Sequence, residues 1–315
     1  MRGLLTVFKK ELQDDFTSWR FIILFLLVLL AGVASVWIAA GNIRGTVTGT
    51  SSFAFIALFT TSSEALPFSF LTFIMLFIPI VGIALGFDAI NNEKNNGTLS
   101  RLVSQPIYRD AVINGKFLAG VVTISVMLVS IILLVTGLGV RMIGVAPTSE
   151  EAIRIFFFLI TTIIYGAFWL GLGILFSILM RRVATSALAS IAIWIFFAFF
   201  MSIIAQMIAN GMAPAGDTME SQVRNIEIQI TASRISPIAL FQEAMIVLLI
   251  PGWRTMGQIL QIQTSADTSF MLANPLSLGQ SLLMVWPHLM IIILLTVVLF
   301  AISYVKFMRE EIRAA

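Results

Sequence analysis

The chain has 315 residues, of which 59% are hydrophobic and 11% charged, and its formal net charge is +3. Soluble domains carry about 25% charged residues, so this composition excludes a soluble globular protein and indicates an all-α protein that crosses a membrane several times. Cysteine is absent, which excludes disulfides, thiolate metal sites and cysteine nucleophiles. The N-terminus shows no cleavable signal pattern, so we expect the first apolar run to be retained as a span.

Residues 1–19 predict an amphipathic helix, because apolar residues recur near the 3.6-residue spacing. A helix of this kind lies in the membrane interface beside the first span. The alternative is an ordinary helix packed on the protein's own loops. The apolar face consists of Leu4, Leu5, Phe8, Leu12, Phe16 and Trp19, and the polar face consists of Lys9, Lys10, Glu11, Gln13, Asp14 and Asp15.

Six apolar runs are long enough to cross a bilayer, which takes about 20 residues. A further run, 236–251, is too short to cross and is bounded by prolines, so we expect a re-entrant or interfacial helix inside the long segment 210–283. Counting this run as a seventh span would place the two termini on opposite sides. The six predicted spans are 20–40, 68–87, 117–140, 155–180, 183–209 and 284–305.

The distribution of lysine and arginine predicts the orientation. One side of the predicted membrane topology carries 13 of the 19 basic residues. Both termini and the polar insert 88–116 are therefore expected to be cytosolic, in a cell membrane (plasma or inner), and segment 210–283 is expected outside. The 13 residues are Arg2, Lys9, Lys10, Arg20, Lys94, Arg101, Arg109, Lys116, Arg181, Arg182, Lys306, Arg309 and Arg313.

The insert 88–116 carries its own helix signals. Thr98 follows an Asn-Asn-Gly turn and is a suitable N-cap, and Pro106 ends the helix that it starts. A second helix is expected to run into the third span through Lys116. The first helix has a small apolar stripe that consists of Leu99, Leu102 and Val103. This arrangement fits a helix that docks in a partner's groove; the alternative is a solvated connecting loop.

The insert also follows an order of residue types: an acidic residue, Gly-Thr, leucines, a proline, a basic residue and a lysine that enters the third span. These residues are Glu93, Gly97, Thr98, Leu99, Leu102, Pro106, Arg109 and Lys116. The order resembles the cytoplasmic signature of type-2 ABC transporter permeases. The N-terminal helix resembles that family's elbow helix, and the six spans match its layout. The long outer segment 210–283 is most similar to the nitrous-oxide-reductase maturation permeases.

The resemblance implies an exporter whose pathway forms between two permease subunits, identical or different, in the lipid bilayer. Two cytosolic ABC ATPase subunits would bind the coupling helices, with ATP and Mg²⁺ in those partners and no cofactor in this chain. The implied ATPase-contacting residues are Glu93, Gly97, Thr98, Leu99, Leu102, Pro106 and Arg109. An alternative is a membrane scaffold or sensor that recruits a partner without ATPase activity.

The source of energy is not visible in the chain itself. It contains no G-x-x-x-x-G-K-[ST] motif for nucleotide phosphates. A proton-driven carrier would place Asp, Glu or His within a span, and the predicted span interiors are essentially free of charge. His288, the single histidine, is interpreted as an interfacial residue, and the 15 methionines as apolar filling rather than a Cu(I) site. We therefore predict no catalytic, metal or nucleic-acid site.

Small residues favour close helix packing in two spans. Gly82-x-x-x-Gly86 lets another helix approach closely, and the fifth span has a small-residue face that includes Ser186 and Ser190. Either could lie at a dimer seam or inside one subunit. The phenylalanine blocks 156–158 and 196–200 are expected to face lipid more often than a substrate.

Overall fold

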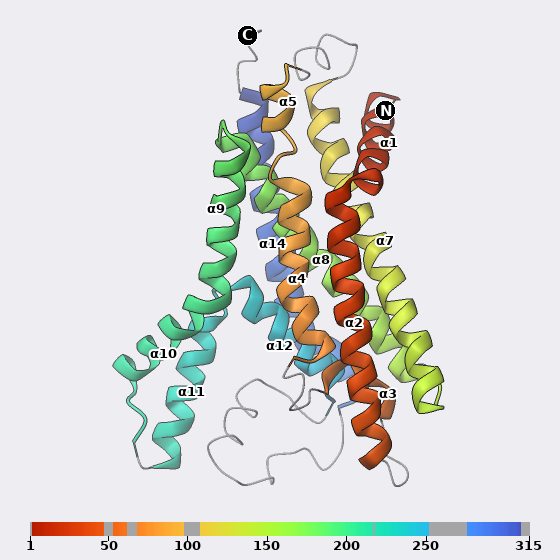
Figure 1. Cartoon of the computed structure of the whole chain (residues 1–315). Coiled ribbons are helices and arrows are strands. Elements are labelled where there is room, and N and C mark those ends of the chain that lie inside the picture. Colours follow the sequence, from red (N-terminus) through yellow and green to blue (C-terminus); the bar gives the residue numbers. More distant parts are fainter. Residues whose placement is uncertain are drawn as a thin grey trace.

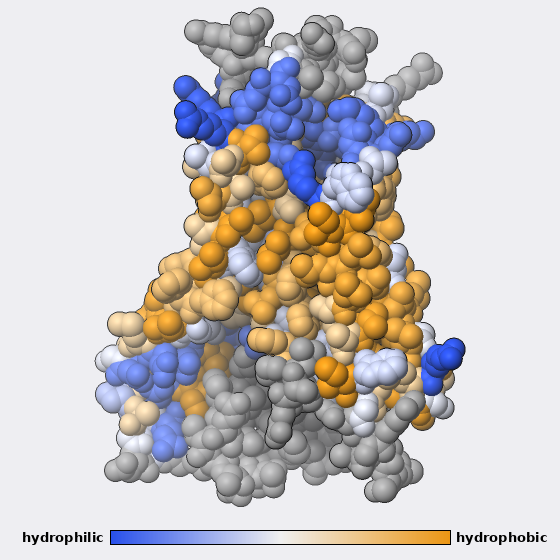
Figure 2. Space-filling model, viewed as in Figure 1, coloured by the Kyte–Doolittle hydropathy of each residue, from blue (hydrophilic) through white to orange (hydrophobic). Residues whose placement is uncertain are grey.

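The computed structural model describes residues 2–46, 53–61, 68–97, 108–216, 218–251 and 276–309. Within these ranges every regular element is a helix and there is no strand. Six helical segments are long and apolar enough to cross a membrane, which confirms the predicted number of spans. Figure 1 shows them side by side, and Figure 2 shows their apolar surface as a belt between two more polar ends.

The spans are longer than the sequence predicts at several ends. The third begins at Arg109 and the fourth at Ser149, because Thr148 and Glu151 form a capping box that starts the helix before the apolar run. The spans are α2 (Trp19–Thr46), α4 (Phe70–Gly86) continued by α5 (Asn91–Asn95), α7 (Arg109–Ile143), α8 (Ser149–Leu179), α9 (Val183–Ile195) continued by η1 (Phe196–Phe200) and α10 (Met201–Met212), and α14 (Leu278–Arg309).

Four further helices complete the described chain: α1 (Arg2–Thr17), α3 (Ala54–Thr60), α11 (Met219–Ser233) and α12 (Pro237–Leu249). The predicted run 236–251 is α12, and it meets α11 at a bend of 118°. Ser236 caps α12 and Pro237 occupies its first turn, which suits a helix start. The helix α1 and the last turns of α14 lie at one end of the bundle, together with α5 (Figure 1); which side of the membrane this is stays a prediction.

Helix α8 lies at the centre of the core. Its Tyr165 ring stacks on Phe241 of α12 at 4.2 Å between centroids, and Trp169 is fully buried. The Gly82–Gly86 pair packs against α8 of the same chain, since a Cβ on Gly86 would lie 2.6 Å from the Leu170 carbonyl oxygen. The structure therefore places this glycine motif inside the subunit.

Changing Gly86 to alanine is expected to destabilise the bundle by about 1–3 kcal/mol, because α4 and α8 must separate to admit the methyl group. Backbone atoms of α8 line the site, so no flexible side chain can give way. Gly137→Ala is the matched control, since a Cβ there meets nothing within 4 Å. Thermal unfolding in detergent measures both; equal melting temperatures would contradict this packing.

A buried carboxylate joins α3 to α8. Glu151 is 2% exposed, and one of its oxygens accepts the backbone N–H groups of Phe55 and Ile56 at 2.9 and 3.2 Å. The other oxygen accepts the N–H and hydroxyl of Thr148 at 2.9 and 3.0 Å. Because both oxygens are fully bonded, this buried charge acts as a fixed link between the starts of the two helices.

Arg154, one turn further along α8, is completely buried. Its guanidinium donates to the carbonyl oxygens of Leu248 and Leu276, at 2.7 and 2.8 Å, and to the Ser281 hydroxyl at 3.1 Å. It also pairs with Glu150 at 2.8 Å. One side chain therefore connects α8 with the end of α12 and the start of α14.

The fifth span contains a π-helical turn, η1. The Met201 N–H bonds to the Phe196 carbonyl oxygen, five residues back, where an α-helix would use four. Phe196, Phe199 and Phe200 are exposed, in keeping with the expectation that this block faces lipid. In the phenylalanine block 156–158, the side chains differ in exposure: Phe156 is exposed and Phe158 is fully buried in the core.

Candidate functional site

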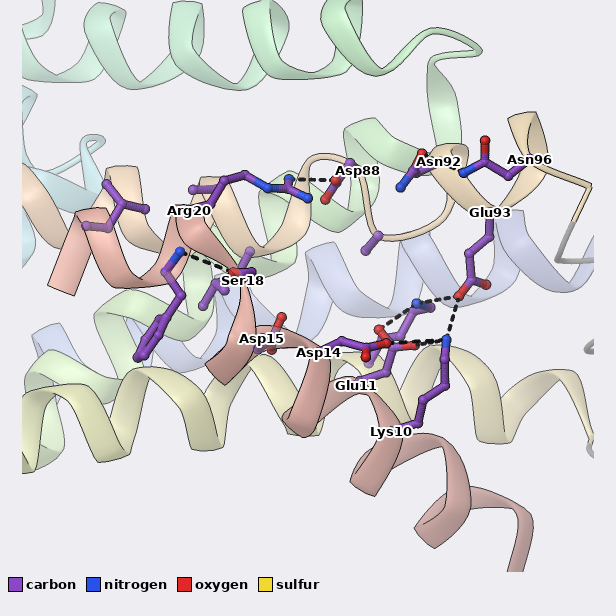
Figure 3. A pocket seen from close by; sticks show the side chains of 16 residues that line it. Lys10, Glu11, Asp14, Asp15, Ser18, Arg20, Asp88, Asn92, Glu93 and Asn96 are labelled. Atoms are coloured by element: carbon purple, nitrogen blue, oxygen red, sulfur yellow. Dashed lines mark hydrogen bonds and ion pairs between the residues drawn. The ribbon is translucent and has the colours of Figure 1, made fainter.

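A polar cavity of about 280 Å³ lies where α1, the end of α4, α5 and α7 meet (Figure 3). We call this region the α1–α5 joint. Its charged lining comes from α1 (Lys10, Glu11, Asp14 and Asp15), from the start of α2 (Arg20), from the α4–α5 segment (Asp88 and Glu93) and from α7 (Lys116). Segments far apart in the sequence thus meet around a single set of charges.

Helix α1 runs along the first half of α7 in close contact. A Cβ on Gly115 would lie 2.9 Å from Val7, so the glycine allows the two helices to approach. Val7 is 3% exposed, whereas Leu5 of the predicted apolar face is 53% exposed. The face of α1 that packs on α7 therefore includes Glu11 and Asp15, which the sequence pattern assigned to the polar face.

Lys116 is the centre of the joint. Its side chain is 6% exposed, and its Nζ lies 2.8 Å from Glu11 Oε2 and 2.9 Å from Glu93 Oε1. Lys10 reaches the same two carboxylates at 3.3 and 3.7 Å. Two acids from α1 and α5 can approach each other here because a buried cation lies between them.

A second ion pair connects the start of α2 to the segment between α4 and α5. Arg20, at the start of α2, donates to Asp88 at 2.6 Å, and its guanidinium carbon lies 5.6 Å from the Phe87 ring centroid. Ser18 lies between α1 and α2, and its hydroxyl accepts the N–H of Phe21. This hydrogen bond caps the start of α2. Both α1 and the start of α2 are thus tied to the segment that leads from α4 to α5.

Asp15 faces α7 without a paired cation at ion-pair distance among the described residues. Burial raises its pKa from the ordinary 3.8 to about 6, and the Thr123 hydroxyl, which donates at 3.2 Å, opposes part of that shift. The folded protein therefore favours the protonated form of Asp15 more than the unfolded chain does.

Asp15→Asn is expected to remove a pH dependence of stability between about pH 4 and 6. The folded protein binds this proton more tightly than the unfolded chain, so wild-type stability falls as pH rises through that window. Asparagine cannot ionise, so the variant should be at least as stable as wild type at pH 7.5, with the advantage shrinking toward pH 4. Melting temperatures across pH measure the effect; Asp14→Asn is the exposed control, and an unchanged Asp15→Asn profile would contradict the assignment.

Two serines hold the start of α5 from the other side. The Ser177 hydroxyl of α8 accepts the N–H groups of Ile90 and Asn91, at 2.9 and 3.1 Å. Ser186 of α9 donates to the Phe87 carbonyl oxygen at 2.7 Å. The small residue Ser186 therefore serves packing inside the subunit, and the segment from Phe87 through α5 is attached to four other spans, α2, α7, α8 and α9.

The structure describes three of the seven predicted contact residues. Glu93 lies in α5 within the joint, Gly97 follows α5 with a left-handed backbone (φ 66°), and Arg109 begins α7. Thr98, Leu99, Leu102 and Pro106 lie outside the described residues. The sequence analysis did not assign Glu11, Asp15 or Ser177 to the site, although the acids at positions 11 and 15 are spaced to share a helix face. Within the described chain, no three His, Asp or Glu side chains are grouped to hold a metal ion.

The residues of the joint and the six spans lie within a single family match. A family model described as ABC-2 family transporter protein matches residues 5–312. The chain belongs to the ABC-2 transporter family. This confirms the family that the insert 88–116 resembles, and it makes the protein a transmembrane ABC transporter permease.

Two relatives of this ABC-2 permease are both named probable ABC transporter permease protein NosY. The one from Pseudomonas aeruginosa is 27% identical over 196 residues, which cover 61% of this chain and 66%, just under two thirds, of the relative. The one from Stutzerimonas stutzeri is 24% identical over 208 residues, which cover 65% of this chain and 70% of the relative.

Proposed function

We propose that this ABC-2 permease is the membrane subunit of an ATP-driven exporter, coupled to two cytosolic ABC ATPase subunits. The observation that carries the proposal is the α1–α5 joint. There, Lys116 fixes α5 to both α1 and α7 through two short ion pairs. A displacement of α5 by a docked partner would therefore move α1 and the spans together.

The sequence order supports this proposal. Residues 98–107 lie between α5 and α7 in the sequence and contain Thr98, Leu99, Leu102 and Pro106, four of the proposed contact residues. Glu93 lies at one end of this stretch and Arg109 at the other. A partner that binds here would thus act on the third span through α7 and on the second through α5.

The permease is proposed to work as a dimer with a second copy or a related subunit. The windows of α2, of α9–α10 and of α14 that cross the membrane are only 28%, 11% and 17% buried within the chain. These faces can pack on lipid or on a second subunit, whereas α4, α7 and α8 are at least half buried within the chain. The two termini and the joint are proposed to lie in the cytosol.

Leu102→Asp is expected to abolish co-purification of the ATPase, because it places a charge on the apolar stripe proposed to dock in the partner's groove. The tagged chain is purified from native membranes, and ATP hydrolysis and partner identity are measured in the eluate. Arg44→Ala, on the opposite side by the predicted topology, is the control and should retain the partner. A wild-type eluate without any nucleotide-hydrolysing subunit would favour the scaffold or sensor alternative.

A further inference from the structure

A second polar cluster lies where the α11–α12 bend meets α14. Arg234 follows α11, Glu243 lies on α12 and His288 on α14. Arg234 donates to the two Glu243 oxygens at 2.9 and 2.7 Å, and His288 Nε2 lies 3.0 Å from Glu243 Oε2. We call these three residues the Arg–Glu–His cluster. His288, interpreted from the sequence as an interfacial residue, thus also contacts a carboxylate on another helix.

His288 is joined to the cluster and to its own helix through its two ring nitrogens. Its Nε2 faces a carboxylate oxygen, and its Nδ1 lies 3.1 Å from the Met284 carbonyl oxygen. Both oxygens are acceptors, so both ring nitrogens of His288 face groups of the protein itself. Arg234 is therefore the cluster residue that can still reach a further group.

No further charged group pairs with Arg234 within the described residues. On α8, Glu150 pairs with Arg154, and Arg154 also donates to Leu248, Leu276 and Ser281. The Arg234 side chain is 43% exposed, while that of Glu243 is 6% exposed. In the part of the chain that the structure describes, no residue accepts a bond from the remaining guanidinium nitrogen, Nη1. The cluster therefore presents a donor and a positive charge outward.

A cavity of about 310 Å³ adjoins the cluster between α12 and α14. Apart from the three cluster residues, its wall is apolar and consists of Leu240, Val247, Met284, Pro287 and Ile291. A cationic end that continues into an apolar hollow matches a molecule with an anionic head and a hydrocarbon chain.

Arginine suits the head group of such a molecule, because its planar guanidinium pairs well with phosphate or carboxylate. Helix α11, which precedes Arg234, lies in the half of the bundle away from α5 (Figure 1).

We propose that the cavity between α12 and α14 binds an amphiphile with a phosphate or carboxylate head group, held by Arg234, with its chain along Met284 and Ile291. The proposal is independent of the ATPase partner and of the direction of transport. A membrane lipid, a transported amphiphile and a free anion share this head-group chemistry, and the probes below separate the amphiphile from the free anion.

The test uses the full chain purified in an uncharged maltoside detergent, with dodecyl phosphate as the probe. Binding to the folded state raises the melting temperature, and we expect a rise of at least about 2 °C. Dodecanol, dodecyltrimethylammonium and inorganic phosphate should each give no rise. An equal rise with inorganic phosphate would show a site for free anions only, and an equal rise with the ammonium probe would show apolar filling only; either result overturns the proposal.

Three variants locate the binding site, each compared with its own melting temperature without probe. Arg234→Gln should lose the rise because it removes the positive charge. Ile291→Trp should also lose it by filling the apolar hollow, and it leaves the cluster intact if Arg234→Gln fails to fold. Arg224→Gln, an exposed arginine on the same helix α11, should retain the rise. A full rise in Ile291→Trp would place the binding elsewhere and overturn the assignment.

Discussion

Replacing Arg154 with methionine is expected to lower the free energy of unfolding by about 3–5 kcal/mol, the range seen when one partner of a buried ionic network is removed. Methionine keeps much of the volume and removes every donor. The carbonyl oxygens of Leu248 and Leu276 and the Ser281 hydroxyl then lose their buried partner. Glu150 retains some solvent access, with a side chain 41% exposed, so the carbonyls account for most of the loss.

The measurement is thermal or denaturant unfolding of the purified chain in detergent. Arg141→Met is the control, because Arg141 is exposed near the end of α7 and should change stability by less than about 0.5 kcal/mol. Because Arg154 joins α12 and α14 to α8, the variant should also expose the α12 region to protease before the rest unfolds. A stability equal to that of the Arg141 variant would contradict the role of this network.

Lys116→Met is expected to separate α1 and α5 from α7 and to cost on the order of 3 kcal/mol. It leaves Glu11 and Glu93, which are 16% and 12% exposed, with only the more distant and exposed Lys10 as a shared cation. In the assembled transporter, the proposed coupling through α5 predicts that transport is lost while the ATPase still hydrolyses ATP. This uncoupling separates the variant from Leu102→Asp, which is expected to lose the ATPase altogether.

A double-mutant cycle isolates the pair. Glu93→Gln combined with Lys116→Met should be less destabilising than the sum of the single changes, with a coupling energy of about 1–3 kcal/mol. Lys9→Met, an exposed lysine on α1, is the control and should be close to neutral. Strict additivity of the two changes would show that the ion pair does not hold α5 in place.

The number and approximate positions of the spans could be predicted because a membrane span requires a long apolar run, which the sequence shows directly. The buried charged side chains could not be predicted in this way, as Lys116 and Arg154 show. The predicted third and fourth spans begin at 117 and 155, so they exclude Lys116 and Arg154 by one residue. In the structure both lie within long helices, near the starts of α7 and α8, and are buried, although they precede the span interiors that were expected to be free of charge. A hydropathy scale scores each charged residue as unfavourable in a span, because it takes no account of an ion-pair or hydrogen-bond partner on another helix.

The joint was predicted only in part, for a similar reason. The insert 88–116 identified Glu93 and the order of residues around it, because that signal is local. Assigning faces to α1 by hydropathy alone put Glu11 and Asp15 outward, since the pattern does not reveal a buried lysine on another helix. His288 shows the same limit: its partner Glu243 lies on α12, and no local spacing connects the two.

The π turn at Phe196–Phe200 also determines where the arm formed by α10 and α11 points. Each residue of an α-helix advances the chain by about 100° around the axis, so the residue accommodated by η1 rotates everything that follows. Asn225 of α11 bonds Asn210 of α10 at 3.0 Å, so the two helices would turn together. A relative one residue shorter in this span would keep the same hydropathy profile and yet present a differently oriented outer arm. Alignments in this family therefore need to be checked for insertions and deletions at this turn before outer surfaces are compared.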